Sequence, residues 1–361
     1  MNKKICVLFF ICSIVWLSIE GSENEKTSKD KILPQGYGIS AKYPGDTGIE
    51  KDPSVIFVEK FEESTFKDLL KRWEDIKHPD IMSFSKDTPE GSAGKQSLLM
   101  KHVGGKGTGG HLYRRLLPGY DKLFLRFYVK FHPECFPIHH FSGLGGYYPP
   151  TRWPQGGAGE RPKGNDRFTI KIEPFGKAWV WDYYVYWMEM RGSPPAGKTW
   201  GNSFIRDPRL KVKRGEWICV ELMVKMNKPV SEHNGELALW IDGKLVSHLG
   251  KGFPKGVWVY DKFVPKNVWA FNKFINYVPG KGGRGIRWNY EKGKGEIFKV
   301  PDEGFPFEGF RWRKNDKLKL NFLWISLYIT KAPEGYVSKV WFDEVVVARK
   351  YIGPIKPKQL H

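Results

Sequence analysis

Cysteine is scarce in this chain, which excludes a fold held together by many disulfides. The 361 residues include 4 cysteines, and two of them, Cys6 and Cys12, lie in an apolar stretch at the N-terminus. The other two are Cys135 and Cys219, so at most one disulfide can form. A single bridge and two buried free thiols remain alternatives. No cysteine spacing is typical of a zinc site.

Long apolar runs are also missing, apart from the one over residues 5–17. The charged start Met1-Asn-Lys-Lys4, this run and the small residues up to Gly21 are typical of a secretory signal peptide over residues 1–21. The run is shorter than the roughly 20 residues that a membrane-spanning helix needs. We therefore expect a secreted or periplasmic protein with no stable membrane insertion after signal cleavage.

Acidic residues are few relative to basic ones. The 39 Asp and Glu residues against 59 Lys and Arg residues give a formal net charge of +20. Such an excess predicts an acidic partner. An exported chain without a nucleic-acid-binding motif does not suit DNA or RNA. We expect an acidic polysaccharide instead, and the oligomeric state stays open.

Helical patterns are rare, and residues 66–73 are the clearest candidate. Residues 22–52 are polar and turn-rich, which predicts a flexible leader. We expect one domain over residues 53–355, followed by a tail over residues 356–361. Within the domain, short alternating runs recur between Gly, Pro and Asp clusters: 54–61, 96–103, 110–116, 122–132, 167–173, 179–189, 215–227, 236–247, 317–330 and 338–349.

This pattern predicts an all-β fold of two packed antiparallel sheets, a β-sandwich or jelly roll with one concave face open. Two long stretches, 145–166 and 250–316, interrupt the strands and predict irregular loops. Loops of that length usually carry function, so we expect them to wall a cleft over the concave face. The alternative is that they cover a sheet edge.

Period-2 alternation divides residues 167–173 and 179–187 into two faces. The face predicted to point to the core carries Phe168, Ile170, Ile172, Trp179, Trp181, Val185 and Trp187. The other face carries Thr169, Lys171, Asp182, Tyr184 and Tyr186. Tyrosines beside a cation on an open sheet face are typical of a carbohydrate site.

The run 123–131 shows the same division. Its apolar positions alternate with Arg126, Tyr128 and Lys130. We expect these three side chains to join the same basic, tyrosine-rich surface. The runs 215–227 and 236–247, with a turn at Asp242-Gly243, are typical of a framework strand pair in a concanavalin-like sandwich.

Three motifs carry a family resemblance. They are His140-Phe-Ser-Gly-Leu-Gly-Gly146, Thr169-Ile-Lys171 and Tyr184-Val-Tyr186. From about Phe57 to Pro354 the chain resembles the jelly-roll polysaccharide lyases of family 14, which include alginate and glucuronan lyases. The resemblance implies cleavage of a uronate-containing polysaccharide by β-elimination.

The resemblance also implies roles for individual residues. Lys171 would offset the substrate carboxylate. Tyr184 or Tyr186 would act as acid and base if nearby cations lower the tyrosine pKa, and His140 is the other candidate base. The residues expected to bind substrate are Thr169, Arg126, Tyr128, Lys130 and Arg167.

The motifs depart from the family at two positions. His140 stands where the family has lysine, and Lys171 stands where it has arginine, which loses a planar fork for carboxylates. A non-catalytic carbohydrate-binding protein on the same fold is therefore the alternative function. A glycoside hydrolase is disfavoured because no pair of carboxylates shares a strand face in the required pattern.

We expect no cofactor and no catalytic metal. His139 and His140 are adjacent, so on a strand they would point to opposite faces, and no carboxylate partner is evident in the sequence nearby. A structural calcium ion bound by scattered Asp and carbonyl oxygens is compatible with the sequence.

Overall fold

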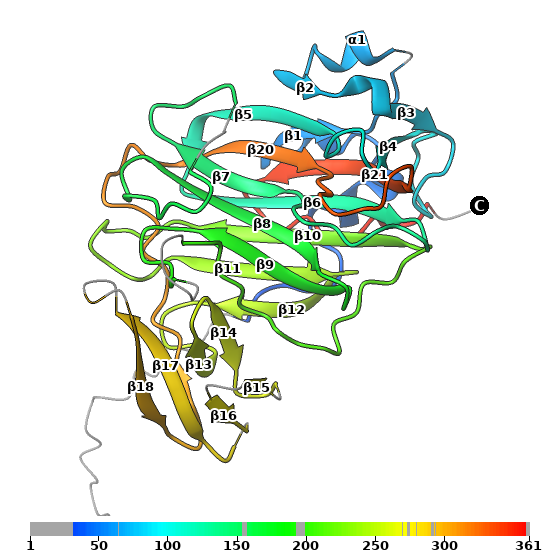
Figure 1. Ribbon diagram of the computed structural model, residues 1–361. Helices are drawn as coiled ribbons and strands as arrows, with labels where there is room; N and C mark the ends of the chain where they lie inside the picture. Colours follow the sequence, from blue (N-terminus) through cyan, green and yellow to red (C-terminus); the bar gives the residue numbers. More distant parts are fainter. Residues whose placement is uncertain are drawn as a thin grey trace, which may run out of the picture. The chain divides into compact units, whose positions relative to one another are not determined.

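Antiparallel strands make up almost all of the regular structure, as the alternating runs predict. Eight strands form one sheet, in the order β12-β11-β10-β6-β21-β4-β3 with β1 also paired to β21. Six strands form a second sheet, in the order β2-β5-β20-β7-β8-β9. The two sheets lie one over the other (Figure 1). The predicted all-β sandwich of jelly-roll type is confirmed.

The computed structural model describes residues 32–63, 65–153, 157–192, 199–268, 270–272, 275–278, 280–289, 292 and 294–358. The predicted signal peptide, leader residues 22–31 and tail residues 359–361 lie outside the described residues. One unit spans Pro34–His361. Across the described residues, no helix is both long enough and apolar enough to cross a membrane.

The strands have the following bounds. The eight-stranded sheet contains β1 (Val55–Glu59), β3 (Met82–Ser85), β4 (Ser97–Val103), β6 (Lys122–Phe131), β10 (Trp217–Lys225), β11 (Glu236–Ile241), β12 (Lys244–Leu249) and β21 (Val337–Ala348). The six-stranded sheet contains β2 (Asp75–Lys77), β5 (His111–Tyr120), β7 (Gly143–Tyr147), β8 (Arg167–Phe175), β9 (Val180–Tyr186) and β20 (Leu320–Ser326). The predicted helix over 66–73 is shorter than expected: α1 covers Phe66–Leu69.

The core lies between the two sheets and is built from the apolar faces that alternation predicts. Leu125 and Phe127 of β6 are fully buried, as are Ile170 and Ile172 of β8. Side chains of the two sheets touch across the gap, since the rings of Phe131 and Trp181 lie 6.0 Å apart. Burial of these side chains supplies the main stabilisation of the sandwich.

Residues 250–316 are not an irregular loop, and that prediction is wrong. They form a small sheet of β13 (Lys255–Val259), β14 (Lys262–Pro265), β17 (Gly283–Asn289), β18 (Lys294–Val300) and β19 (Phe305–Pro306), and the pair β15 (Ala270–Asn272) and β16 (Ile275–Tyr277). The small sheet has its own cluster of buried residues: Val257, Val259, Val264, Val268, Tyr277, Ile286 and Val300. Its strands are short and rich in Lys, Gly and Arg, which obscured the alternation in the sequence.

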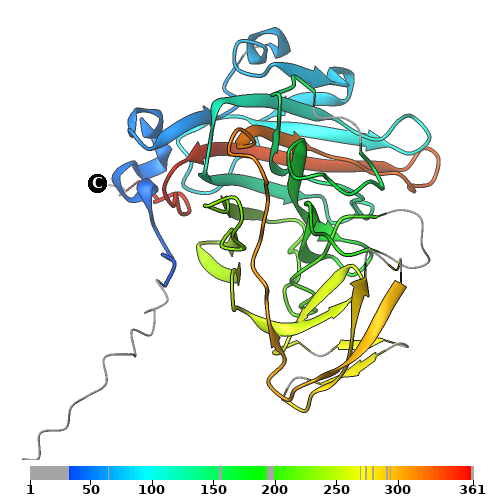
Figure 2. The same ribbon diagram turned by 90° about the vertical axis from the view of Figure 1, so that its left-hand side faces the viewer.

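Residues 34–52 are packed against the eight-stranded sheet, in contrast to the flexible leader that their composition predicts. Ile49 and Asp46 are fully buried. The backbone of residues 38–40 hydrogen-bonds to residues 351 and 352, so this segment lies beside the chain that follows β21 (Figure 2). Asp46 also forms an ion pair with the buried guanidinium of Arg126 on β6.

We expect this buried ion pair to anchor the segment. Asp46→Ala would leave the Arg126 guanidinium buried without its counterion, which costs about 3–5 kcal/mol of unfolding free energy. Urea denaturation of the two proteins measures the loss. Glu50→Ala is the matched control, because Glu50 is half exposed and lies 3.6 Å from Lys60, so its removal is expected to change stability by less than about 0.5 kcal/mol. Equal stabilities for Asp46→Ala and Glu50→Ala would contradict the anchor.

Candidate functional site

The outer face of the six-stranded sheet carries a row of residues aligned by strand register. Lys171 on β8 lies opposite Tyr184 on β9 and opposite Gly143 on β7. Gly143 in turn lies opposite Trp324 on β20. Because Gly143 has no side chain, the side chain of Lys171 can extend over it toward β20. The Nζ atom of Lys171 lies 3.7 Å from the centre of a Trp324 ring. A Cβ at Gly143 would lie 1.9 Å from the carbonyl oxygen of Ile170.

A pocket of about 240 Å³ opens over this row. Its lining comes from the five strands of the sheet other than β2, from the loop 148–166, and from His140, Trp200 and Tyr328 outside the strands. The lining residues are His111, His140, Tyr147, Gly157, Ala158, Arg167, Thr169, Lys171, Tyr184, Tyr186, Trp200, Trp324 and Tyr328. Six of the nine residues predicted for the site are among them: His140, Arg167, Thr169, Lys171, Tyr184 and Tyr186. The first of the two long stretches therefore does wall the pocket, through Gly157 and Ala158.

His140 is held by a buried carboxylate. Its Nδ1 lies 3.0 Å from Oε1 of Glu173, which is 4 % exposed. A carboxylate oxygen accepts a hydrogen bond from Nδ1–H, so an imidazole in this tautomer presents the lone pair of Nε2. The ring centres of His140 and Tyr184 lie 4.6 Å apart. The pair thus orients a proton acceptor beside the tyrosines.

Tyr184 and Tyr186 form the wall of the pocket on β9. Their hydroxyl oxygens lie 3.4 Å apart, and the Tyr186 hydroxyl accepts a hydrogen bond from the Gly159 N–H at 3.3 Å. Burial, reinforced by Tyr186, raises the pKa of Tyr184. The expectation that cations lower this pKa is therefore wrong for Tyr184. Its hydroxyl stays protonated at neutral pH and is suited to donate a proton.

Two further groups line the pocket, the cation of Lys171 and the neutral imidazole of His111. Burial lowers the pKa of Lys171 to about 8, so most molecules carry the charged ammonium at pH 7. Burial, with Lys171 nearby, lowers the pKa of His111 to about 3, so His111 is neutral. The Trp324 indole donates to Nδ1 of His111 at 3.1 Å, which places the imidazole proton on Nε2.

Thr169 and Arg167 lie on β8 at the same pocket. Thr169 is paired with Tyr186 in the register. The Arg167 guanidinium donates to the carbonyl of Glu160 at 3.2 Å, which ties the loop 148–166 to the strand. Both residues line the pocket, as expected for residues that bind substrate. Their contact with a bound polysaccharide stays a prediction.

Arg126, Tyr128 and Lys130 do not join this surface, so their predicted place is corrected. All three are on β6, a central strand of the other sheet. Arg126 is fully buried against Asp46, the Tyr128 hydroxyl accepts from the Ile355 N–H at 2.8 Å, and Lys130 pairs with Asp87 at 2.7 Å. Their alternation was interpreted correctly, but alternation does not reveal to which sheet a strand belongs.

Asp182 lies on the same face of β9 as Tyr184, opposite Glu173 in the register, but the chain at residues 204–205 covers it. It is 1 % exposed, and its carboxylate accepts hydrogen bonds from the backbone N–H groups of Tyr183, Phe204 and Ile205. This carboxylate fixes the chain that runs beside β9. Its role in the structure is therefore to hold the wall that carries Tyr184 and Tyr186.

Sequence reasoning missed five side chains of the site: His111, Glu173, Trp200, Trp324 and Tyr328. Trp324 and His111 had a weak signal, because they alternate with apolar residues in runs that were recognised as strands. Glu173 ends the run 167–173 and is paired with Asp182 in the register. Its contact with His140 joins residues 33 positions apart, which no local pattern could reveal.

The described residues contain no group of three or more His, Cys, Asp or Glu side chains that could hold a metal ion. His139 and His140 do not point to opposite faces, since their ring centres lie 4.3 Å apart, but the nearest partner of His139 is the Thr330 hydroxyl. Cys135 and Cys219 are both buried free thiols. A structural calcium ion stays a prediction.

Comparison with known proteins gave matches among solved structures. The chain is similar to a double mutant of alginate lyase Aly36B in complex with an alginate tetrasaccharide, at a TM-score of 0.47 and 13% identity over 82% of this chain and 98% of that chain. It is similar to alginate lyase vAL-1 from Chlorella virus, at a TM-score of 0.45 and 12% identity over 81% of this chain and 100% of that chain. It is similar to endo-beta-1,4-glucuronan lyase from the fungus Trichoderma reesei, at a TM-score of 0.42 and 15% identity over 85% of this chain and 100% of that chain. No family model and no curated protein matches the chain.

The low pKa of Lys171 predicts a specific pH dependence of stability. Its folded pKa is about 8 against an ordinary value of 10.5, so between these pH values the unfolded chain binds the proton that the folded chain has lost. Stability contributed by this group therefore rises with pH through that window, by up to about 3 kcal/mol. In Lys171→Met this rise is absent.

Urea unfolding of both proteins across the window measures the difference, since the other titrating groups are common to the two. We expect Lys171→Met to be more stable than the wild type at pH 7, with the difference vanishing above pH 10.5. Two parallel stability curves would contradict this assignment.

Proposed function

We propose that the protein is a secreted polysaccharide lyase that cleaves an acidic, uronate-containing polysaccharide by β-elimination. The observation that carries the proposal is the arrangement around one pocket of a carboxylate-held imidazole, a protonated tyrosine and a cation. These are the three kinds of group that this reaction requires. The family-14 resemblance and the export of the chain remain predictions that accompany the proposal.

The first requirement is an offset for the charge of the substrate carboxylate. Removing the proton next to a carboxylate places further negative charge on it, and this charge dominates the barrier. Lys171 supplies a buried cation, and Nε2–H of neutral His111 supplies a hydrogen-bond donor on the same face. Water is partly excluded there, so each interaction is stronger than at the surface.

The second requirement is a base, and the His140–Glu173 pair supports this role. The base takes the proton on the carbon that bears the carboxylate. Glu173 receives the Nδ1 hydrogen bond, so it stabilises the imidazolium that forms when Nε2 accepts the proton. Glu173 is thus a positioning residue, and His140 is the proposed catalytic base.

The third requirement is an acid for the leaving oxygen. As the C–H electron pair becomes the new carbon–carbon double bond, the bond to the glycosidic oxygen breaks and that oxygen keeps its electron pair. Tyr184 gives it a proton, since the raised pKa of this residue keeps its hydroxyl protonated at neutral pH. Tyr186, at hydrogen-bond range of Tyr184, is the group that can return a proton to it.

The proposed substrate follows from charge and shape. The chain has a net charge of +20, and aromatic rings of Trp200, Trp324 and Tyr328 line the pocket beside the cation. Sugars present apolar C–H faces to such rings and carboxylates to such cations. The mechanism proposed here requires no cofactor, since the residues named supply the base, the acid and the charge offset.

Incubation of the mature protein with a panel of polyuronates tests the reaction. We expect a rise in ultraviolet absorbance on at least one polymer, because β-elimination creates a double bond conjugated to the carboxylate. A hydrolase would release reducing ends without this absorbance. Binding without any absorbance change across the panel would favour the alternative, a non-catalytic carbohydrate-binding protein.

Tyr184→Phe tests the assignment of the acid. The ring remains and the hydroxyl is lost, so we expect kcat to fall by about 10²–10⁴-fold while polymer binding persists. Tyr37→Phe is the control, because Tyr37 is 51% exposed and lies on the packed segment 34–52. Full activity of Tyr184→Phe would exclude Tyr184 as the acid, and loss of binding in this variant would indicate a role in holding the sugar.

A further inference from the structure

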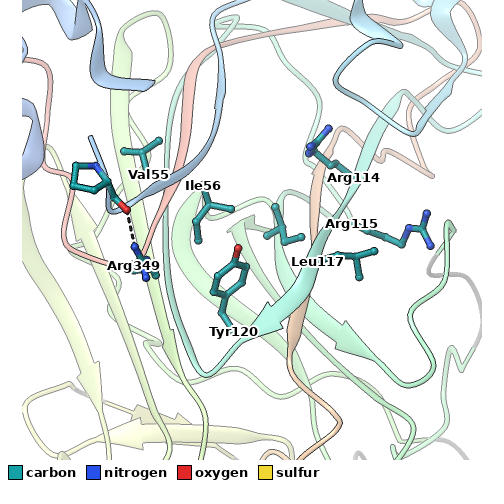
Figure 3. Close-up of a pocket in the computed structure, with 9 residues that line it drawn as sticks. Val55, Ile56, Arg114, Arg115, Leu117, Tyr120 and Arg349 are labelled. Carbon is teal, nitrogen blue, oxygen red and sulfur yellow. Dashed lines mark hydrogen bonds between the residues drawn. The ribbon is translucent and has the colours of Figure 1, made fainter. Parts of the chain in front are cut away.

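A second hollow, drawn in Figure 3, is lined on β5 by residues 114–117 and Tyr120. It has a volume of about 420 Å³. The nearest lining residues of the two sites on β5 are His111 and Arg114, three positions or about 10 Å apart, and no residue lines both. The two sites are therefore separate.

The hollow exists because two strand edges are left uncovered at the same place. Strand β2 pairs with β5 only along His111–Tyr113, so the following residues of β5 have no neighbour on that side. Strand β1 is an edge strand of the other sheet and pairs only with β21. Between these edges lie the apolar side chains of Ile56 and Leu116.

Two arginines at the rim, Arg114 and Arg349, have no carboxylate as a direct hydrogen-bond partner, although the charge of Arg114 acts on the Glu74 carboxylate from a longer distance. Arg349 donates to the carbonyl of Pro53 at 2.6 Å, and Arg114 donates to the carbonyl of Arg72 and stacks 4.9 Å from the ring of Phe57. These contacts orient each guanidinium but leave its charge in place. Within the described part of the chain, neither arginine forms an ion pair with Asp or Glu.

A neighbouring arginine shows the contrast. Arg115 also lines the hollow, but its Nε lies 2.8 Å from the carboxylate of Glu74. Its charge is therefore offset by a direct ion pair, whereas the two rim guanidinium groups without such a pair are those of Arg114 and Arg349.

An aromatic ring completes the hollow. Tyr120 is part of the lining and lies between Arg349 and Leu117 (Figure 3). Leu117 is 50% exposed beside it. A ring and exposed aliphatic groups next to two oriented guanidinium groups suit a ligand that has both an apolar face and an anionic group.

We propose that this hollow is a second binding site for the acidic polysaccharide, which takes a carboxylate-bearing sugar residue away from the candidate site. The identity of the polymer rests on the proposed function. Charge complementarity supports the choice, since a chain of net charge +20 leaves two oriented arginines unpaired here. A long polymer held at this hollow remains close to the protein between cleavage events.

The test uses the full mature chain with Tyr184→Phe, so that turnover does not alter the polymer. In this background, Arg114→Gln with Arg349→Gln is compared with the control Arg214→Gln with Lys101→Gln. The control removes the same charge from exposed positions, and Arg214 lies 4.9 Å from the ring of Trp179 just as Arg114 lies over Phe57. Affinity electrophoresis in gels that contain alginate, glucuronan or a neutral glucan gives the dissociation constants.

We expect the hollow variant to bind the long polyuronate about tenfold more weakly than the control variant, because charge-assisted hydrogen bonds are lost. Neither variant should change retardation in the neutral glucan. Equal weakening in both double variants, or no binding of either polyuronate by the parent, overturns the proposal. Should the double variant unfold, Arg349→Gln alone replaces it, since the Arg349 side chain is exposed. A dissociation constant of Arg349→Gln equal to that of Lys101→Gln then also overturns the proposal.

The comparison of dissociation constants does not depend on whether the protein is a lyase. Wild-type absorbance on the same polymers reports the lyase reaction, whereas the electrophoresis reports the hollow. A protein that binds through the hollow and shows no absorbance change would refute the proposed reaction and leave the second site standing. The reverse combination would refute the second site alone.

Discussion

The packing of two apolar sheet faces against each other is the constraint on which the rest of the structure depends. On β8 and β9 every second side chain is committed to this core, so the remaining side chains must lie on the outer face. That requirement places Lys171 and Tyr184 side by side and holds their backbones rigidly. The site is therefore built on strands rather than on loops, which favours precise geometry.

The candidate site keeps polar groups at some expense in stability. Lys171 is 7% exposed, and its burial lowers its pKa to about 8. An apolar side chain at position 171 would make the folded protein more stable, so the retained cation indicates a role other than folding. The same reasoning applies to Glu173, which is buried and meets the solvent-facing His140. Groups of this kind gather at one pocket of the six-stranded sheet.

Much of the fold could be predicted because alternation is a local property. The apolar faces of β6, β8 and β9 were assigned correctly from spacing alone. The small sheet of β13–β19 was missed, since its short strands carry lysine and glycine at positions where a longer strand would show aliphatic residues. The packed segment 34–52 was missed for a different reason. Its polar composition is typical of a loose chain, and only the distant Arg126 gives Asp46 a buried partner.

The sequence by itself determined the fold class, the faces of the strands and six residues of the pocket, which lie on β8, on β9 and, for His140, shortly before β7. These follow from residue types at short spacings. Only the tertiary structure decided that β6 belongs to the opposite sheet, that His111 and Trp324 complete the pocket, and that Glu173 holds His140. Strand order and contacts between distant residues depend on how whole sheets pair and pack, and no local spacing encodes that choice.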